Sequence, residues 1–260
     1  MSLADLRVLQ RRGAVALASR ETRRVLSLWT QTILPSIVTA LLFLAVFGAA
    51  LGPRIGDVEG LDYLAFVLPG VLVMTAIGPA IANASTSLYQ AKSEGYIEDI
   101  LTSPLRPSQI VAAYAAGSLV RAWVAALAVA LEAAPFTGGI AHLPAAVAAL
   151  VLAGLLFASL GVIVGIAAET FDQQAFVANL VVTPLALLAG VFYSARSLEE
   201  PWETLTRLDP LYYVVDATRY GFTGYSDAPV GVSLAAAAAA AAAVFALAVA
   251  LVGRGWRLKP

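Results

Sequence analysis

The chain has 260 residues, of which 60% are hydrophobic and 13% are charged, and its formal net charge is −1. A soluble domain has about 25% charged residues, so this chain cannot cover a globular surface with charge, and most of its surface must face lipid. It contains no Cys, which excludes disulfides, thiol chemistry and metal sites built from thiolates.

The N-terminal segment, residues 1–31, contains six Arg and no long apolar run. Leu6, Leu17 and Val25 are separated by Arg-rich positions, which is typical of an amphipathic helix lying on the inner leaflet. The segment can also serve as a positive-inside anchor, and the two interpretations are compatible. It lacks a short apolar core followed by a small-residue cleavage site, so we expect no cleaved signal peptide.

Six stretches are long and apolar enough to cross a bilayer, which takes about 20 residues. They are Val25–Pro53, Tyr63–Ala91, Pro107–Leu131, Leu143–Ala168, Gln173–Ala195 and Ala228–Gly253. One charge, Arg121, lies inside the third stretch, and a Gly- and Pro-rich turn that includes Gly138 precedes the fourth. The sequence therefore predicts one all-α membrane domain, residues 1–260, with a six-span bundle over residues 32–254.

An even number of spans places both termini on the same side of the membrane. Eleven basic residues fall on that side, namely Arg7, Arg11, Arg12, Arg20, Arg23, Arg24, Lys92, Arg106, Arg254, Arg257 and Lys259. Four fall on the other side, namely Arg54, Arg196, Arg207 and Arg219. Because Lys and Arg are concentrated in cytoplasmic loops, both termini are predicted to be cytoplasmic, and an outer loop over residues 197–225 is predicted to be external.

The predicted cytoplasmic loop after the second span reads EGYIEDILTSPLRP. Ser93 can cap a short helix that starts near Glu94, and we expect this helix to cover residues 94–104 and to end at Pro104. Its apolar and acidic side chains lie on different faces, with Tyr96, Ile100 and Leu101 on one and Glu94 and Glu98 on another. Such a helix suits a groove on a soluble partner, although a solvated loop with routine capping has the same pattern.

The pattern E-G-x-x-E-x-[IL]-L-x-S-P-L in this loop resembles the cytoplasmic loop of ABC type-2 transporter permeases. In that family the loop forms a coupling helix that inserts into an ATPase subunit. The resemblance therefore implies an ATPase-coupling role for the residues that match the motif. They are Glu94, Gly95, Tyr96, Glu98, Leu101, Ser103 and Pro104.

Residues 183–224 resemble the same family at the end of its fifth span and in the outer loop that follows. The resemblance implies short re-entrant helices that dip into the outer leaflet and gate release, although an ordinary belt of interfacial aromatics is the other interpretation. Asp209 stands where the family commonly has Asn. The matching positions assigned to the outer gate are Pro184, Gly190, Tyr193, Trp202, Pro210, Tyr212, Tyr213 and Arg219.

The resemblance covers nearly the whole chain and is closest to the lipopolysaccharide- and nodulation-type exporters of bacterial inner membranes. It implies ATP-driven export of a polysaccharide, a lipid or a hydrophobic small molecule. Two copies of this chain would pair with two copies of a separate P-loop ATPase, which would hold ATP and magnesium. The chain itself has no Gly-Lys-Ser/Thr motif and a lone His142. We therefore expect it to hold no cofactor or metal, to bind no nucleic acid and to contact membrane lipid.

Three polar residues inside the spans, Asn83, Arg121 and Asn179, are candidates for a substrate path. Polar residues in spans more often bond between helices, and Arg121 can also reach the inner headgroups. Two other protein classes are alternatives. An intramembrane enzyme acting on lipid-linked intermediates needs converging His, Asp or Arg groups. A secondary transporter needs carboxylates near the midplane, where the sequence offers Glu132 alone.

Overall fold

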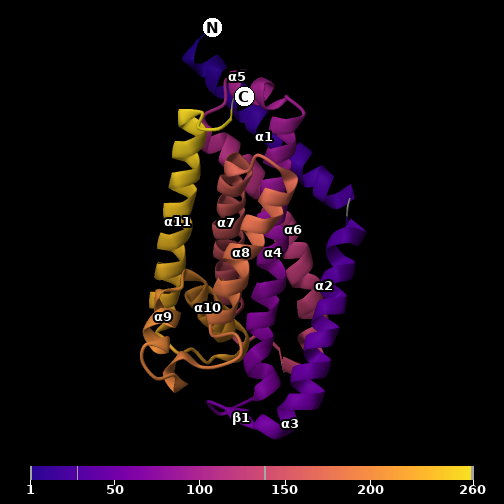
Figure 1. Cartoon of the computed structure of the whole chain (residues 1–260), viewed down its shortest axis with the longest axis vertical. Helices are drawn as coiled ribbons and strands as arrows, with labels where there is room; N and C mark the ends of the chain where they lie inside the picture. Colours follow the sequence, from indigo (N-terminus) through magenta and orange to yellow (C-terminus); the bar gives the residue numbers. More distant parts are fainter. Residues whose placement is uncertain (1, 28, 138, 259–260) are drawn as a thin grey trace.

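The computed structural model describes residues 2–27, 29–137 and 139–258. Gly138 and Lys259, which entered the predictions from sequence, lie outside these ranges. The described residues form a tall helical bundle, and both ends of the chain lie at the same end of the bundle as α5 (Ile97–Thr102) (Figure 1). The opposite end holds α3 (Gly52–Ile55), β1 (Asp57–Val58) and α9 (Trp202–Leu208). We name these the α5 end and the α9 end.

Six described helices are long and apolar enough to span a membrane, and each overlaps one of the predicted stretches. They run Trp29–Ile55, Tyr63–Ser93, Pro107–Leu131, Leu143–Ala167, Phe171–Leu188 and Val230–Arg254. The prediction of an all-α membrane protein with six candidate spans is therefore confirmed. The main elements are α2 (Trp29–Phe43), a π-helical segment (Leu44–Leu51), α4 (Tyr63–Ser93), α6 (Pro107–Thr137), α7 (Leu143–Ala167), α8 (Phe171–Leu188), α10 (Pro210–Thr223) and α11 (Val230–Arg254).

Short elements connect the spans at the α9 end. β1 pairs antiparallel with β2 (Leu61–Asp62) ahead of α4. Asp62 caps α4 by accepting a hydrogen bond of 3.0 Å from the Leu64 amide. A single 3-10 turn (Ala195–Ser197) precedes α9.

α1 (Leu3–Ser27) precedes the spans and buries one narrow stripe. Leu17, Glu21 and Val25 are 8%, 1% and 3% exposed, and their spacing of four residues places them on one helix face. The apolar stretch Val25–Pro53 begins inside α1, where Val25 is buried, and the first candidate span begins at Trp29. The placement of α1 on a membrane leaflet stays a prediction.

The fifth predicted span is wrong at its C-terminal end. α8 stops at Leu188 rather than Ala195, because Gly190 adopts a left-handed conformation with a φ of +67°. Nη2 of Arg219 donates a hydrogen bond of 2.6 Å to the Gly190 carbonyl and so holds the turn in place. The end of α8 cannot be read from the sequence, because the apolar run continues past it and Gly190 is the one residue that indicates a break.

α4 and α7 pack with their backbones in close contact. A Cβ at Gly161 would lie 2.5 Å from the carbonyl oxygen of Ile81, and one at Gly165 would lie 2.8 Å from the carbonyl oxygen of Ser85. Small residues about one turn apart allow membrane helices to approach this closely. The contact covers the C-terminal half of α4, which leads into α5.

The α5 end has its own apolar core, which we name the α5-end cluster. A larger cluster lies around Phe66, Leu72 and Phe157. The tail after α11 joins the α5-end cluster through Leu258, so the tail and α5 share one core. The larger side chains of the α5-end cluster are Leu17, Leu88, Ile97, Ile100, Ile110, Val111, Tyr114, Val162, Ile166, Val252 and Leu258.

Candidate functional site

The predicted coupling helix starts later than expected. α4 continues to Ser93, and Glu94 is its C-terminal cap residue. Gly95 turns the chain with a φ of +82°, and α5 then begins at Ile97. The predictions that Ser93 caps this helix and that the helix starts at Glu94 are therefore wrong, because both residues complete α4.

α5 ends two residues before Pro104. Ser103 adopts an extended conformation with a ψ of +157°, as expected for a residue that precedes proline. Its Oγ donates a hydrogen bond of 2.6 Å to the carbonyl of Ile100. This bond satisfies one of the carbonyls that a helix C-terminus leaves without an intrahelical donor.

α5 turns its apolar face toward the rest of the chain. Ile97 and Ile100 are 3% and 8% exposed and belong to the α5-end cluster, while Tyr96 and Leu101 pack half-buried against it. A partner at this end therefore meets the acidic face of α5 and not its apolar face. The exposed residues are Glu94, Gly95, Glu98, Asp99, Thr102 and Pro104.

A cleft of about 380 Å³ opens beside α5. Its walls come from the end of α4, from α5, from the turn between α7 and α8, and from the C-terminal tail. Glu98 and Glu169 line it together with Lys92 and Arg257. Glu169 and Arg257 form an exposed ion pair of 3.5 Å. The cleft therefore brings together three parts of the chain that are distant in sequence, which are the α4–α5 segment, the turn between α7 and α8, and the C-terminal tail.

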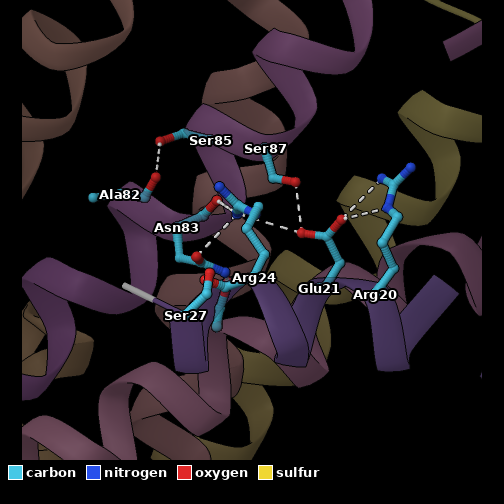
Figure 2. Close-up of polar contacts among 9 residues, drawn as sticks. Arg20, Glu21, Arg24, Ser27, Ala82, Asn83, Ser85 and Ser87 are labelled. Atoms are coloured by element: carbon cyan, nitrogen blue, oxygen red, sulfur yellow. Dashed lines mark hydrogen bonds and ion pairs between the residues drawn. The ribbon is translucent and has the colours of Figure 1, made fainter. Parts of the chain in front are cut away.

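Figure 2 shows a polar network that attaches α1 to α4. Glu21 accepts hydrogen bonds from Nη2 of Arg20 at 2.9 Å and from Nη2 of Arg24 at 3.3 Å. The Ser87 hydroxyl of α4 donates to the same carboxylate at 2.6 Å. Arg24 also donates to Oδ1 of Asn83 at 3.0 Å. The sequence alone does not single out Glu21, because an acid among six Arg has the pattern of a solvated surface charge.

α1 also contacts both flanks of α5. The guanidinium of Arg20 lies 5.0 Å from the centre of the Tyr96 ring, just before α5. After α5, the side chain of Leu105 packs on Gly13, where a Cβ would lie 3.1 Å from its Cδ2. α1, α4 and α5 therefore form one packed unit at the α5 end.

The three candidates for a substrate path do not line one cavity. Asn83 is buried and donates from Nδ2 to the Ser118 hydroxyl of α6 at 3.1 Å. Asn179 is exposed on α8 and lines a cavity of about 230 Å³ with Thr86 and Gln174, and neither Asn83 nor Arg121 lines that cavity. Arg121 is half-buried on α6. The Glu132 side chain lies outside the side chains that the structure describes.

At the α9 end, Arg219 is completely buried. Its Nε donates to the carbonyl of Phe66 at 3.1 Å, and its guanidinium lies 3.9 Å from the centre of the Phe66 ring. Together with its bond to Gly190, these contacts join α10 to α4 and to the end of α8. Burial lowers the pKa of Arg219, and the nearby Asp227 and Asp216 carboxylates oppose that shift.

Two buried aspartates extend this contact to α11. The Asp216 carboxylate accepts from the Ser233 hydroxyl at 2.6 Å and from the Asp227 amide at 2.6 Å. The Asp227 carboxylate accepts from the Ser194 hydroxyl at 2.7 Å and from the Ala195 amide at 2.9 Å. The chain between α8 and α9 is thereby fixed to α10 and to the start of α11.

The structure brings some of the outer-gate candidates together and leaves others apart. Gly190 packs beside the Tyr212 ring, where a Cβ would lie 3.4 Å from its Cδ2. The Tyr193 hydroxyl donates to the Leu188 carbonyl at 2.9 Å. Pro184 and Trp202 are exposed, and Tyr213 is half-buried.

α9 and α10 are the two short helices of the predicted outer loop. With 7 and 14 residues, both are too short to cross a bilayer. Pro210 occupies the first turn of α10, and Asp209 caps it by accepting from the Leu211 amide at 2.8 Å. Burial raises the pKa of Asp209 to about 6. Whether these helices dip into a leaflet stays a prediction.

A family model described as "ABC-2 type transporter" matches residues 13–223, from α1 to the end of α10. The chain belongs to this family. The permease is 34% identical over 242 residues to the inner membrane transport permease YadH of Escherichia coli, an alignment that covers 93% of this chain and 94% of YadH. It is 29% identical to nodulation protein J of Rhizobium meliloti, over 88% of this chain and 87% of the relative. It is 28% identical to nodulation protein J of Rhizobium leguminosarum biovar trifolii, over 89% of this chain and 91% of the relative.

These comparisons confirm the family resemblance that the two sequence motifs carried. The protein is therefore a membrane transport permease subunit, and its described residues include six helices that could span a membrane. Membership of the ABC-2 family implies an ABC transporter system in which an ATPase is the partner. The matched range includes both α5 and Arg219.

Proposed function

We propose that the permease is the membrane-spanning half of an ATP-driven exporter. Two copies of it pair with two copies of a P-loop ATPase, which binds ATP and magnesium. Closure of the ATPase dimer moves α5, and the spans rearrange around a path between the two permeases. The cargo is a polysaccharide, a lipid or a hydrophobic small molecule that leaves past the α9 end.

The distribution of charge supports an orientation with the α5 end in the cytoplasm. The basic residues of α1, of the tail after α11 and of the loop that contains Arg106 gather at this end. Basic residues are typical of cytoplasmic segments next to a membrane. In this orientation α5 faces the cytoplasm, where a soluble ATPase subunit has access to ATP.

The observation that carries the proposal is the exposed acidic face of α5. Ile97 and Ile100 are committed to the α5-end cluster, so the surface offered to a soluble subunit consists mainly of Glu94, Glu98 and Asp99. Carboxylates that face only water gain little from their charge, whereas carboxylates docked against basic side chains contribute to affinity and specificity.

The experiment compares Glu94→Ala/Glu98→Ala with Glu199→Ala/Glu200→Ala, a pair of exposed acids near the α9 end. The ATPase that copurifies with the permease is pulled down with each variant, and ATP turnover of each complex is measured. We expect the first pair to insert normally and to weaken ATPase binding about tenfold or more, or to uncouple hydrolysis from transport. The second pair should match wild type.

Two results would reject the proposal. One is wild-type ATPase binding and turnover in Glu94→Ala/Glu98→Ala, which would make the loop a solvated connector. The other is robust ATP hydrolysis by the purified permease alone, because the chain has no P-loop.

A further inference from the structure

Lys92 places its ammonium at the C-terminal end of a different helix. It is the last residue but one of α4, and its Nζ donates to the carbonyls of Ile166 at 2.6 Å and Ala168 at 2.9 Å. A third carbonyl, that of Gly165, lies 3.4 Å away. These groups belong to the last turn and C-cap of α7, where carbonyls lack intrahelical donors and a cation is favoured by the helix dipole. Lys92 therefore caps α7.

A second cation contacts the same helix end. Nη1 of Arg257 donates to the Ala167 carbonyl at 3.1 Å and lies 3.5 Å from the Glu169 carboxylate. Arg257 stands in the tail after α11, next to Leu258 in the α5-end cluster. The turn between α7 and α8 is thus held by α4 on one side and by the tail on the other.

We propose that Lys92 is a positioning residue that fixes the turn between α7 and α8 beside α5, so that the turn and α5 face the ATPase as one docking surface. Glu98 of α5 and Glu169 of the turn line the same cleft, and Lys92 lines it as well. Three donors on a flexible stem suit a group of converging carbonyls. The inference rests on the proposed function, because it concerns how the ATPase is contacted.

The test measures amide hydrogen exchange in two segments, residues 94–106 and residues 165–170, with and without the copurifying ATPase. In wild type we expect the ATPase to slow exchange in both. In Lys92→Met, exchange of residues 165–170 should rise about tenfold in the free permease. ATPase protection of that segment should be lost while residues 94–106 stay protected. Lys92→Arg, which keeps the donors, should restore the wild-type pattern.

Arg254→Met is the matched control, since it removes a cation from the same end without touching the carbonyls of α7. Equal protection of both segments in Lys92→Met, or loss of protection in Lys92→Arg as severe as in Lys92→Met, would overturn the inference. So would a turn that the ATPase leaves unprotected in wild type while α5 is protected. If neither segment is protected in wild type, the proposed function itself fails.

If Lys92→Met does not insert into the membrane, Arg257→Met carries the test. Arg257 is an exposed tail residue outside the spans, and its loss removes the other donor to the end of α7. We expect faster exchange in residues 165–170 with no change in residues 94–106. Unchanged exchange in both segments would contradict the inference.

Discussion

Replacement of Glu21 tests whether α1 is attached to the bundle by its buried network. Glu21→Ala removes the partner of Arg20 and Arg24 and the acceptor of the Ser87 hydroxyl. Breaking a fully buried ion pair costs about 3–5 kcal/mol. Here the Arg20 and Arg24 side chains are 46% and 28% exposed, so the remaining cations reach water and the electrostatic cost is smaller. A buried hydroxyl left without its acceptor adds about 1–3 kcal/mol. We expect a total loss of about 2–4 kcal/mol in the free energy of unfolding.

The assay is equilibrium unfolding in detergent micelles, with Glu21→Gln and Glu199→Ala as controls. Glu21→Gln keeps the side-chain volume and one acceptor, so it should lose only about 1–2 kcal/mol, and the exposed Glu199→Ala should stay within about 0.5 kcal/mol of wild type. A double-mutant cycle with Ser87→Ala should give a coupling energy of about 1 kcal/mol. A Glu21→Ala variant as stable as wild type, or strictly additive losses in the cycle, would refute the attachment.

Three further predictions concern packing, pH and topology. Gly161→Ala places a Cβ 2.5 Å from the Ile81 carbonyl oxygen and should lower the free energy of unfolding by about 3 kcal/mol, whereas Gly78→Ala, whose Cβ would meet nothing within 4 Å, should be neutral or stabilising. Equal stability of the two variants would contradict the close contact between α4 and α7. The pKa of Asp209 is raised from 3.8 to about 6 in the folded state, so the folded state binds a proton more tightly than the unfolded state, and the free energy of unfolding should fall by up to about 3 kcal/mol as the pH rises from 4 through 6. Asp209→Asn keeps the cap of α10 and should lose this pH dependence when unfolding is measured at several pH values, and an unchanged pH dependence would assign it to another group. In intact cells, Cys at Ser197 should react with an impermeant thiol reagent and Cys at Ser93 should not, and the opposite labelling would invert the proposed orientation.

The spans could be predicted because their signal is local. A run of about 20 apolar residues has few alternatives to a membrane helix, and one candidate span of the structure overlaps each of the six runs. Helix ends that depend on distant contacts could not be predicted in the same way. The stop after Leu188 depends on Gly190 and on the Arg219 side chain, which comes from another helix.

The candidate site was predictable in its location and not in its orientation. The acidic pattern around Glu94 and Glu98 marked the right segment, but the sequence does not show which face of the short helix packs on the bundle. Only the tertiary structure assigns Ile97 and Ile100 to the α5-end cluster. The roles of Glu21 and Lys92 could not be predicted from the sequence either. Ser87, which bonds to Glu21, lies 66 residues away, and Ile166, which bonds to Lys92, lies 74 residues away.

The early end of α8 has a consequence for the surrounding lipid. At 1.5 Å per residue, its 18 residues reach about 27 Å, less than the hydrocarbon core of a typical bilayer, about 30 Å. The 25 residues of α11 reach about 38 Å. Such hydrophobic mismatch is relieved by local thinning of the membrane or by association with another protein surface. Phe176, Leu180 and Leu187 are exposed on α8, so compressed acyl chains or a second protein surface would meet the permease along this helix, and its behaviour in vesicles should depend on acyl-chain length.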